Sequence, residues 1–176
     1  MKMKNSYDLS KLKLLEKIGE GGFGKVYKVE NKETGDIYAA KVSINEVDPD
    51  NQNEMLDLYR EVSIISAVHH PSVLSFIGYS QTDFDSEPNP VIITEFSPNG
   101  SLDHLIKLSR NGANIDSFDD TKKLIILYGI AAGMSYLHSH QILHRDLKAA
   151  NILVDERLCP KIADFGLSKI YHNQTT

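Results

Sequence analysis

The pattern of hydrophobic and polar residues changes character near residue 100. Before that point, short apolar runs with strand-like alternation follow one another at 14–18, 25–30, 37–44, 73–77 and 91–96. Apolar residues with a period of two are typical of half-buried strands. The turn-forming residues at 33–36 predict an antiparallel connection between the second and third runs. The first half is therefore predicted to form an antiparallel sheet of five strands.

One helical pattern interrupts these strands. Asp48 before Pro49 marks its predicted start, because proline suits the first position of a helix. The pattern ends before His70 and Pro71. Its apolar stripe consists of Met55, Leu58, Val62 and Ile65. We expect this helix to pack on the sheet.

The chain after Pro98, Asn99 and Gly100 is predicted to be mainly helical, because these turn formers separate it from the strands. Ser101 can cap a short helix, and Ser117 with Asp120 resembles a capping box at the start of a long one. The long helix has a helical period of apolar residues at Leu124, Leu127, Ala131, Met134 and Leu137. Two short apolar runs, 152–154 and 160–163, are predicted to pair as a hairpin.

Composition and charge exclude several classes of function. A net charge of −5 and a pI of about 5.8 give no basic surface for nucleic acid. Cys159 is the only cysteine, so neither an intrachain disulfide nor a cysteine-rich zinc site can form, and a cytoplasmic location is expected. The most apolar stretch, 124–134, is shorter than the roughly 20 residues of a membrane span, and no signal peptide is apparent. No membrane partner is expected.

The first chemical motif is a glycine-rich segment in which Gly19, Gly21 and Gly24 match G-x-G-x-x-G. Glycines let backbone N–H groups approach phosphate oxygens without obstruction. A dinucleotide-binding loop would open a helix after Gly24, whereas residues 25–30 alternate like a strand. A hairpin that covers phosphates is favoured, although a glycine-rich hairpin without a ligand has the same pattern.

A cation follows on the third predicted strand. Ala39 and Lys41 are two residues apart, so they face the same side of the sheet. Lys41 could be a solvated surface charge, but its apolar neighbours favour a half-buried strand. Glu61 lies on the apolar face of the predicted helix and needs a partner there, for which Lys41 is the candidate.

The strongest signal comes from two motifs in the second half. Residues 144–151 read His-Arg-Asp-Leu-Lys-Ala-Ala-Asn, and residues 164–166 read Asp-Phe-Gly. They match H-R-D-L-x-x-x-N and D-F-G, so the sequence resembles the protein kinase family. The segment 91–102, which includes Thr94, resembles the tyrosine-kinase-like group of serine/threonine kinases. The predicted hairpin would bring Asn151 and Asp164 side by side.

The resemblance implies ATP and Mg²⁺ as cofactors and a protein as substrate. Gly19, Gly21 and Gly24 would cover the phosphates, and Lys41, paired with Glu61, would hold two of them. Thr94 would lie behind the adenine. The remaining nucleotide-binding residues would be Ile18, Val26, Ala39 and Leu153 around the adenine and the backbone of Glu95 and Ser97 beside it.

The same resemblance assigns the catalytic groups. Asn151 and Asp164 would bind Mg²⁺, Asp146 would accept or orient the proton of the substrate hydroxyl, and Lys148 would steady the γ-phosphate, as in serine/threonine kinases. Arg145 before Asp146 suggests control by a phosphorylated loop, with Thr175 and Thr176 as candidate acceptors. Zinc binding by the histidines near residue 140 is disfavoured, because no cysteine or acidic cluster joins them.

The expected fold is α+β and protein-kinase-like. An N-terminal lobe at 12–96, with a five-stranded antiparallel sheet and one helix, follows an extension at 1–11. A hinge at 97–100 leads to an incomplete, mainly helical C-terminal lobe at 101–176, because an A-P-E motif is absent. Two hypotheses remain open: an ATP-dependent serine/threonine kinase that is part of a longer chain, and a non-catalytic fragment that binds ATP or a partner. On either hypothesis the long helix should expose apolar surface.

Overall fold

The computed structural model describes residues 6–21, 24–43, 52–115 and 118–171. The predicted helix start at Asp48 and Pro49 lies outside these residues, as do Ser117, Thr175 and Thr176. The chain divides into two compact units. Unit 1 comprises Met1–Ser66 and Ser75–Phe96, and unit 2 comprises Ala67–Leu74 and Ser97–Thr176.

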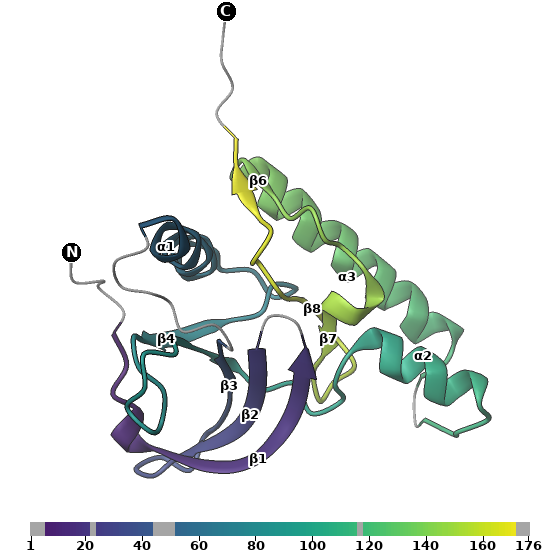
Figure 1. The fold of residues 1–176 in the computed structure, drawn as a ribbon. Coiled ribbons are helices and arrows are strands. Elements are labelled where there is room, and N and C mark those ends of the chain that lie inside the picture. Colours follow the sequence, from purple (N-terminus) through teal and green to yellow (C-terminus); the bar gives the residue numbers. More distant parts are fainter. Residues whose placement is uncertain (1–5, 22–23, 44–51, 116–117, 172–176) are drawn as a thin grey trace, which may run out of the picture. The chain divides into compact units, whose positions relative to one another are not determined.

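Unit 1 contains a five-stranded sheet, as predicted (Figure 1). Its strands are antiparallel and lie in the order β1-β2-β3-β5-β4. Their bounds are Leu12–Gly21 for β1, Gly24–Asn31 for β2, Ile37–Val42 for β3, Phe76–Ser80 for β4 and Val91–Glu95 for β5. The predicted start of the fourth strand at residue 73 is wrong, because Val73 instead bridges Ile162 and the Leu74 N–H donates to the Ile162 carbonyl, both within unit 2.

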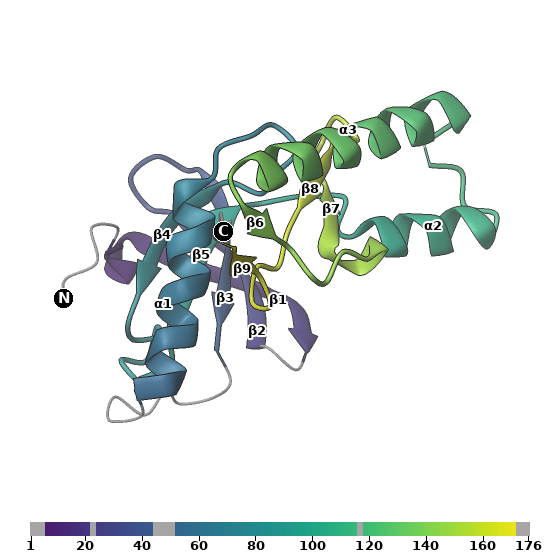
Figure 2. The ribbon, with the colours of Figure 1, turned by 90° about the horizontal axis from the view of Figure 1, so that it is seen from above.

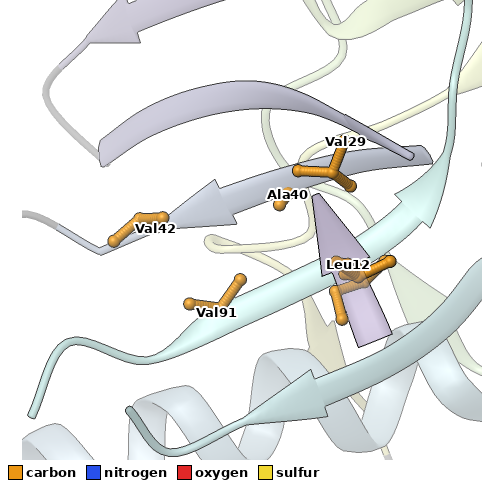
Figure 3. Close-up of a cluster of buried hydrophobic side chains, with 6 residues drawn as sticks. Leu12, Val29, Ala40, Val42 and Val91 are labelled. Atoms are coloured by element: carbon orange, nitrogen blue, oxygen red, sulfur yellow. The ribbon is translucent and has the colours of Figure 1, made fainter. Parts of the chain in front are cut away.

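The two faces of this sheet carry different apolar clusters. One face holds a cluster formed by Leu12, Val29, Ala40, Val42, Val91 and Ile93 (Figure 3). Ile92 lies between Val91 and Ile93, so it points to the opposite face, where it packs with Tyr79 and with Val62 of helix α1 (Gln52–Ala67). Helix α1 therefore covers the face that also carries Ala39 and Lys41.

The segment before β1 packs on this unit rather than standing apart from it. Leu9–Lys11 forms the 3₁₀ helix η1. The Tyr7 N–H donates to the Tyr79 carbonyl at 2.7 Å, and the Tyr7 hydroxyl accepts from the Asn31 amide at 3.1 Å. Gly78 lies directly against the Tyr7 ring, and a Cβ at this position would collide with it.

Unit 2 combines helices with short strands (Figure 2). Helix α2 (Leu102–Arg110) is capped by Ser101, as predicted, since the Ser101 hydroxyl accepts from the His104 N–H at 3.3 Å. The predicted hairpin is present as β7 (Ile152–Val154) and β8 (Pro160–Ile162), which contact α2 and α3, respectively. The remaining elements are α3 (Asp120–Ser139), β6 (Ile142–Leu143), the 3₁₀ helix η2 (Ala149–Asn151) and β9 (Lys169–Ile170).

Helix α3 begins two residues later than a cap at Ser117 implies, because Asp119 is the N-cap and accepts from the Lys122 N–H at 2.7 Å. Its predicted buried stripe is also partly wrong, since Leu124 is 67% and Leu127 62% exposed. The packed face contains Leu137, as predicted, together with Ile126, Ile130 and Gly133. The glycine permits close approach to β8, because a Cβ on Gly133 would lie 2.7 Å from Ile162 Cδ1.

Apolar residues surround α3, so periodicity alone does not distinguish its inner face. The exposed side carries Leu124, Ile125, Leu127 and Tyr128, in agreement with the expected exposed apolar surface. Within the described residues, no helix combines the length and the apolar character needed to cross a membrane.

Candidate functional site

The glycine-rich hairpin joins β1 to β2. Gly19 pairs with Val26, and Gly21 pairs with Gly24 at the end of the ladder. Gly24 has φ +141°, and an added Cβ would collide with the Val42 carbonyl oxygen, so only glycine fits there. No atom lies within 4 Å of a Cβ built on Gly21, and Gly19 would make only ordinary contacts. The glycines thus have different roles: Gly24 shapes the hairpin, while Gly19 and Gly21 leave space beside it.

The register of the sheet brings the predicted nucleotide-binding residues of unit 1 into two neighbouring rows. Val26 pairs with Lys41, and Lys41 pairs with Ile92. In the next row, Ala39 lies between Lys28 and Thr94. Directly opposed residues in antiparallel strands project from the same face. Val26, Ala39, Lys41 and Thr94 therefore share the α1 face.

Lys41 and Glu61 form the predicted ion pair. The Lys41 Nζ lies 3.3 Å from Glu61 Oε1, and the two side chains are 26% and 17% exposed. Partial burial reduces solvent screening of this contact. The lysine thus provides a partner for the Glu61 carboxylate on the inner face of α1, and the glutamate in turn holds Lys41 in place at the sheet.

The end of β5 is held by contacts that the sequence did not indicate. The Glu95 carboxylate accepts from the Ser75 N–H at 2.8 Å, and the Glu95 N–H donates to the Ser75 carbonyl at 2.9 Å. The Thr94 hydroxyl donates to the Glu95 carbonyl at 3.2 Å, and the Lys28 ammonium lies 5.1 Å from the centre of the Phe96 ring. The Glu95 carbonyl is the one that the resemblance pairs with adenine.

For three other residues predicted to bind the nucleotide, the structure gives only their exposure and backbone contacts. Ile18 in β1 is 44% exposed. Ser97, the first residue of the second stretch of unit 2, is buried, and its carbonyl accepts from the Gly100 N–H at 3.1 Å. Leu153 lies in β7, is half-buried and bridges Ser101.

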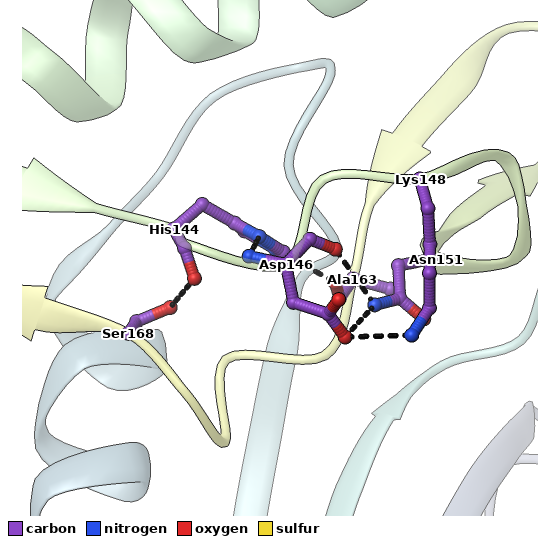
Figure 4. Close-up of polar contacts among 6 residues, drawn as sticks. All are labelled: His144, Asp146, Lys148, Asn151, Ala163 and Ser168. Carbon is purple, nitrogen blue, oxygen red and sulfur yellow. Dashed lines mark hydrogen bonds and ion pairs between the residues drawn. The ribbon is translucent and has the colours of Figure 1, made fainter.

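Asp146 is the centre of a polar network in unit 2 (Figure 4). Its Oδ2 atom accepts from the Lys148 ammonium at 2.8 Å and from the Asn151 amide at 2.8 Å. The hydrogen bond from Lys148 lowers the pKa of Asp146, with a further contribution from Asn151. The same bond raises the pKa of Lys148. The network therefore favours an ionised carboxylate beside a cation.

Asn151 and Asp164 flank the open end of the β7–β8 hairpin, as expected: one comes before β7 and the other follows β8. Asn151 immediately precedes β7, and the Ala163 N–H, one residue before Asp164, donates to the Asn151 carbonyl at 2.9 Å. The Asn151 amide nitrogen donates to both the carbonyl and the carboxylate of Asp146, and these two bonds do not use its Oδ1 atom. Amide and carboxylate oxygens are the hard ligands that Mg²⁺ prefers.

Buried His144 connects Asp146 to the segment around Asp164. Its Nδ1 accepts from the Asp146 N–H at 3.4 Å, which places the proton of the neutral ring on Nε2. Nε2 then donates to the Ala163 carbonyl at 2.9 Å, and the ring packs edge-on against Phe165. The Ser168 hydroxyl donates to the His144 carbonyl at 3.2 Å. Ser168 was missed, because a single serine in a short segment carries no sequence signal of its own.

Comparison with known proteins identifies the class. A family model described as protein kinase domain matches residues 12–176. The chain is 38% identical over 162 residues to the probable serine/threonine-protein kinase SIS8 of Arabidopsis thaliana, covering 90% of this chain and 14% of that protein. The same identity and length hold for serine/threonine-protein kinase CTR1 of that plant, with 90% and 18% covered.

A third relative, cysteine-rich receptor-like protein kinase 2 of Arabidopsis thaliana, is 37% identical over 160 residues, which cover 89% of this chain and 23% of that protein. The chain therefore belongs to the protein kinase domain family. It spans less than a quarter of the length of these three relatives. Kinase domains in general use ATP and Mg²⁺ and act on proteins.

Proposed function

We propose that this chain is the nucleotide-binding and catalytic part of a protein serine/threonine kinase, which transfers the γ-phosphate of ATP to serine and threonine hydroxyls. One observation carries the proposal: Lys148 and Asn151 both donate to the same carboxylate oxygen of Asp146 at 2.8 Å. The contacts orient a carboxylate next to a cation and an amide, which suits proton acceptance beside a developing negative charge.

In this proposal Asp146 orients the attacking hydroxyl and accepts its proton. The hydrogen bond from Lys148 lowers its pKa further below neutral pH, and its side chain is 24% exposed, so a substrate hydroxyl can reach it. Lys148, with a half-exposed side chain, offsets charge on the phosphoryl oxygens. Asn151 and Asp164 would hold Mg²⁺. The placement of Lys148 two residues after Asp146 supports serine and threonine as acceptors, as do the printed names of SIS8 and CTR1.

Most of the residues proposed to bind the nucleotide belong to unit 1. Lys41, held by Glu61, supplies a positive charge to the phosphates. Gly19, Gly21 and Gly24 would cover the phosphates without a side chain in the way. The Glu95 carbonyl and the Ser97 N–H would bind the adenine edge, and its faces would contact Ile18, Val26, Ala39 and Leu153. When bound, ATP supplies the phosphoryl group and Mg²⁺ neutralises charge on its oxygens.

The organisation that goes with this function is an N-terminal lobe at 12–96, a connecting segment at 97–100 and a C-terminal lobe at 101–176. The boundary between Phe96 and Ser97 that separates the two compact units supports it. We also propose a cytoplasmic location, where ATP is abundant and the one cysteine stays reduced. A protein substrate is favoured over nucleic acid by the net charge of −5.

The proposal is tested by incubating the purified chain with γ-labelled ATP, Mg²⁺ and three peptide pools that offer only serine, only threonine or only tyrosine. Label is expected in the serine and threonine pools. Label confined to tyrosine would contradict the acceptor assignment. ATP binding without transfer to any pool would favour the alternative of a non-catalytic, ATP-binding module.

A further inference from the structure

Ser168 is a buried polar residue that the proposed mechanism does not use. It is 2% exposed, and its hydroxyl donates to the His144 carbonyl at 3.2 Å. Its N–H donates to the Phe165 carbonyl at 2.9 Å, which closes the turn that follows Asp164. Ser168 is therefore hydrogen-bonded through its N–H to the segment that contains Asp164 and through its hydroxyl to the loop that contains Asp146. Figure 4 shows the second of these contacts.

A second bond runs beside this one. The Arg145 Nε donates to the Leu167 carbonyl at 2.5 Å. Consecutive residues of the loop, His144 and Arg145, are thus bonded to consecutive residues of the turn, Leu167 and Ser168. Beyond them, the strand pairs Leu143 with Lys169 and Ile142 with Ile170 continue the connection.

The backbone at these contacts has an unfavourable conformation. Arg145 has φ +66° and Asp164 has φ +64°. Both values lie in the left-handed region, which residues other than glycine adopt infrequently. The orientation of the peptide between His144 and Arg145 is coupled to φ of Arg145, and the Ser168 hydroxyl holds the oxygen of that peptide. Such conformations persist when surrounding contacts fix them, and they concentrate at functional sites.

We propose that Ser168 is a positioning residue, whose hydroxyl fixes the peptide between His144 and Arg145 and thereby sets Asp146 relative to the metal-binding Asp164. His144 transmits the effect, because it also bonds the Asp146 N–H and the Ala163 carbonyl. This inference rests on the proposed function. Ser168→Ala leaves a buried carbonyl without its donor and releases both segments locally.

The test compares the unmodified chain with Ser168→Ala, Ser168→Thr and the control Ser139→Ala. The Ser139 hydroxyl donates to the Tyr136 carbonyl at 2.8 Å and lies 3.2 Å from His140 Nδ1, so the control removes an exposed serine hydroxyl from the last turn of α3. Amide hydrogen exchange is measured residue by residue without ligand. The Mg²⁺ concentration for half-maximal rate, kcat and the peptide KM are measured with ATP.

Ser168→Ala should raise exchange at Asp146, Ala163 and Ser168 while exchange in α2 stays unchanged. It should also lower kcat about tenfold, as expected for loss of one hydrogen bond, with a higher Mg²⁺ requirement and the same peptide KM. Ser168→Thr should restore much of the exchange protection and of kcat, because it keeps the hydroxyl. Ser139→Ala should match the unmodified chain in every measurement. Unchanged exchange in Ser168→Ala, or a uniform rise that includes α2, would overturn the positioning role. An unmodified chain without transfer would refute the proposed function, while local exchange would still decide the role of Ser168.

Discussion

Asn151 holds Asp146 at two points. Its amide nitrogen lies 2.9 Å from the Asp146 carbonyl oxygen and 2.8 Å from the carboxylate Oδ2. Because an amide nitrogen has two hydrogens, these bonds use both of them and fix the orientation of the side chain. The arrangement links the proposed proton acceptor directly to a proposed metal ligand, so a change in one should alter the other.

Replacing Asn151 should therefore impair two properties together. We expect Asn151→Leu to lower kcat by at least about tenfold and to raise the Mg²⁺ requirement, because it removes both an oxygen ligand and the donor to Asp146. Asn89→Leu is the control, since Asn89 donates to Asp83 at 2.7 Å in unit 1, far along the chain. Steady-state rates across a Mg²⁺ series provide the measurement. A fall in kcat with an unchanged Mg²⁺ requirement would argue against the metal role.

The contact between Lys148 and Asp146 predicts a change in the pH profile. The hydrogen bond from Lys148 lowers the pKa of Asp146, so the carboxylate stays ionised to lower pH than usual. In Lys148→Met this pKa should rise towards its ordinary value, and the acidic limb of kcat/KM should move to higher pH. Stability should depend on pH in the same direction. The hydrogen bond between Lys148 and Asp146 stabilises the fold at pH values above the ordinary pKa of aspartate, and this stabilisation is lost as the pH falls.

Lys123→Met is the matched control for that profile. Lys123 lowers the pKa of the exposed Asp120 through a contact of 2.9 Å. This contact resembles the one between Lys148 and Asp146, but it lies on α3. Its rate profile should superimpose on that of the unmodified chain. An unchanged acidic limb in Lys148→Met would show that Asp146 does not control the rate.

The ion pair between Lys41 and Glu61 should be required for phosphoryl transfer rather than for folding. Lys41→Met should lower kcat by about 10²–10³-fold, the range for removing one group that stabilises transition-state charge. Glu61→Gln should have a smaller effect, because the lysine keeps its charge but loses its ionic partner. Lys107→Met, which removes an exposed ion pair with Asp103, should leave the rate unchanged. Full activity of Lys41→Met with unchanged thermal unfolding would contradict the role.

The two glycines at the end of the hairpin should differ in their tolerance of a methyl group. Gly24→Ala should destabilise the chain by about 1–3 kcal/mol, because φ is +141° and the Cβ meets the Val42 carbonyl. Gly21→Ala should change stability by less than about 0.5 kcal/mol, because its Cβ would meet open space. Urea unfolding measures both. Equal losses would show that the hairpin has a different backbone conformation in solution.

The sheet and the ion pair were predictable because they follow local rules. Alternation placed Ala39 and Lys41 on one face, and Glu61 on an apolar helix face required a partner. The start of the fourth strand was wrong because it depended on a distant contact. Val73 and Leu74 have strand-like side chains, but their backbone pairs with Ile162 rather than with the sheet. No local pattern could indicate that choice.

Helix α3 and Ser168 illustrate the same limit. Apolar residues surround α3, and the close approach of β8 depends on Gly129 and Gly133, which an analysis of apolar periodicity does not count. Ser168 bonds to a residue 24 positions earlier, through a hydroxyl that resembles any surface serine in the sequence. The roles of the individual site residues stay predictions until variants are measured.

The central claim is that Asp146 accepts the substrate proton in a site that binds ATP, and Asp146→Asn tests it most directly. Phosphoryl transfer to serine and threonine peptides is measured alongside equilibrium binding of ATP with Mg²⁺, with Asp120→Asn as the control. The account predicts a fall in kcat of about 10²–10⁴-fold in Asp146→Asn, with ATP affinity and thermal unfolding close to those of the unmodified chain. Transfer at the full rate by Asp146→Asn would contradict it.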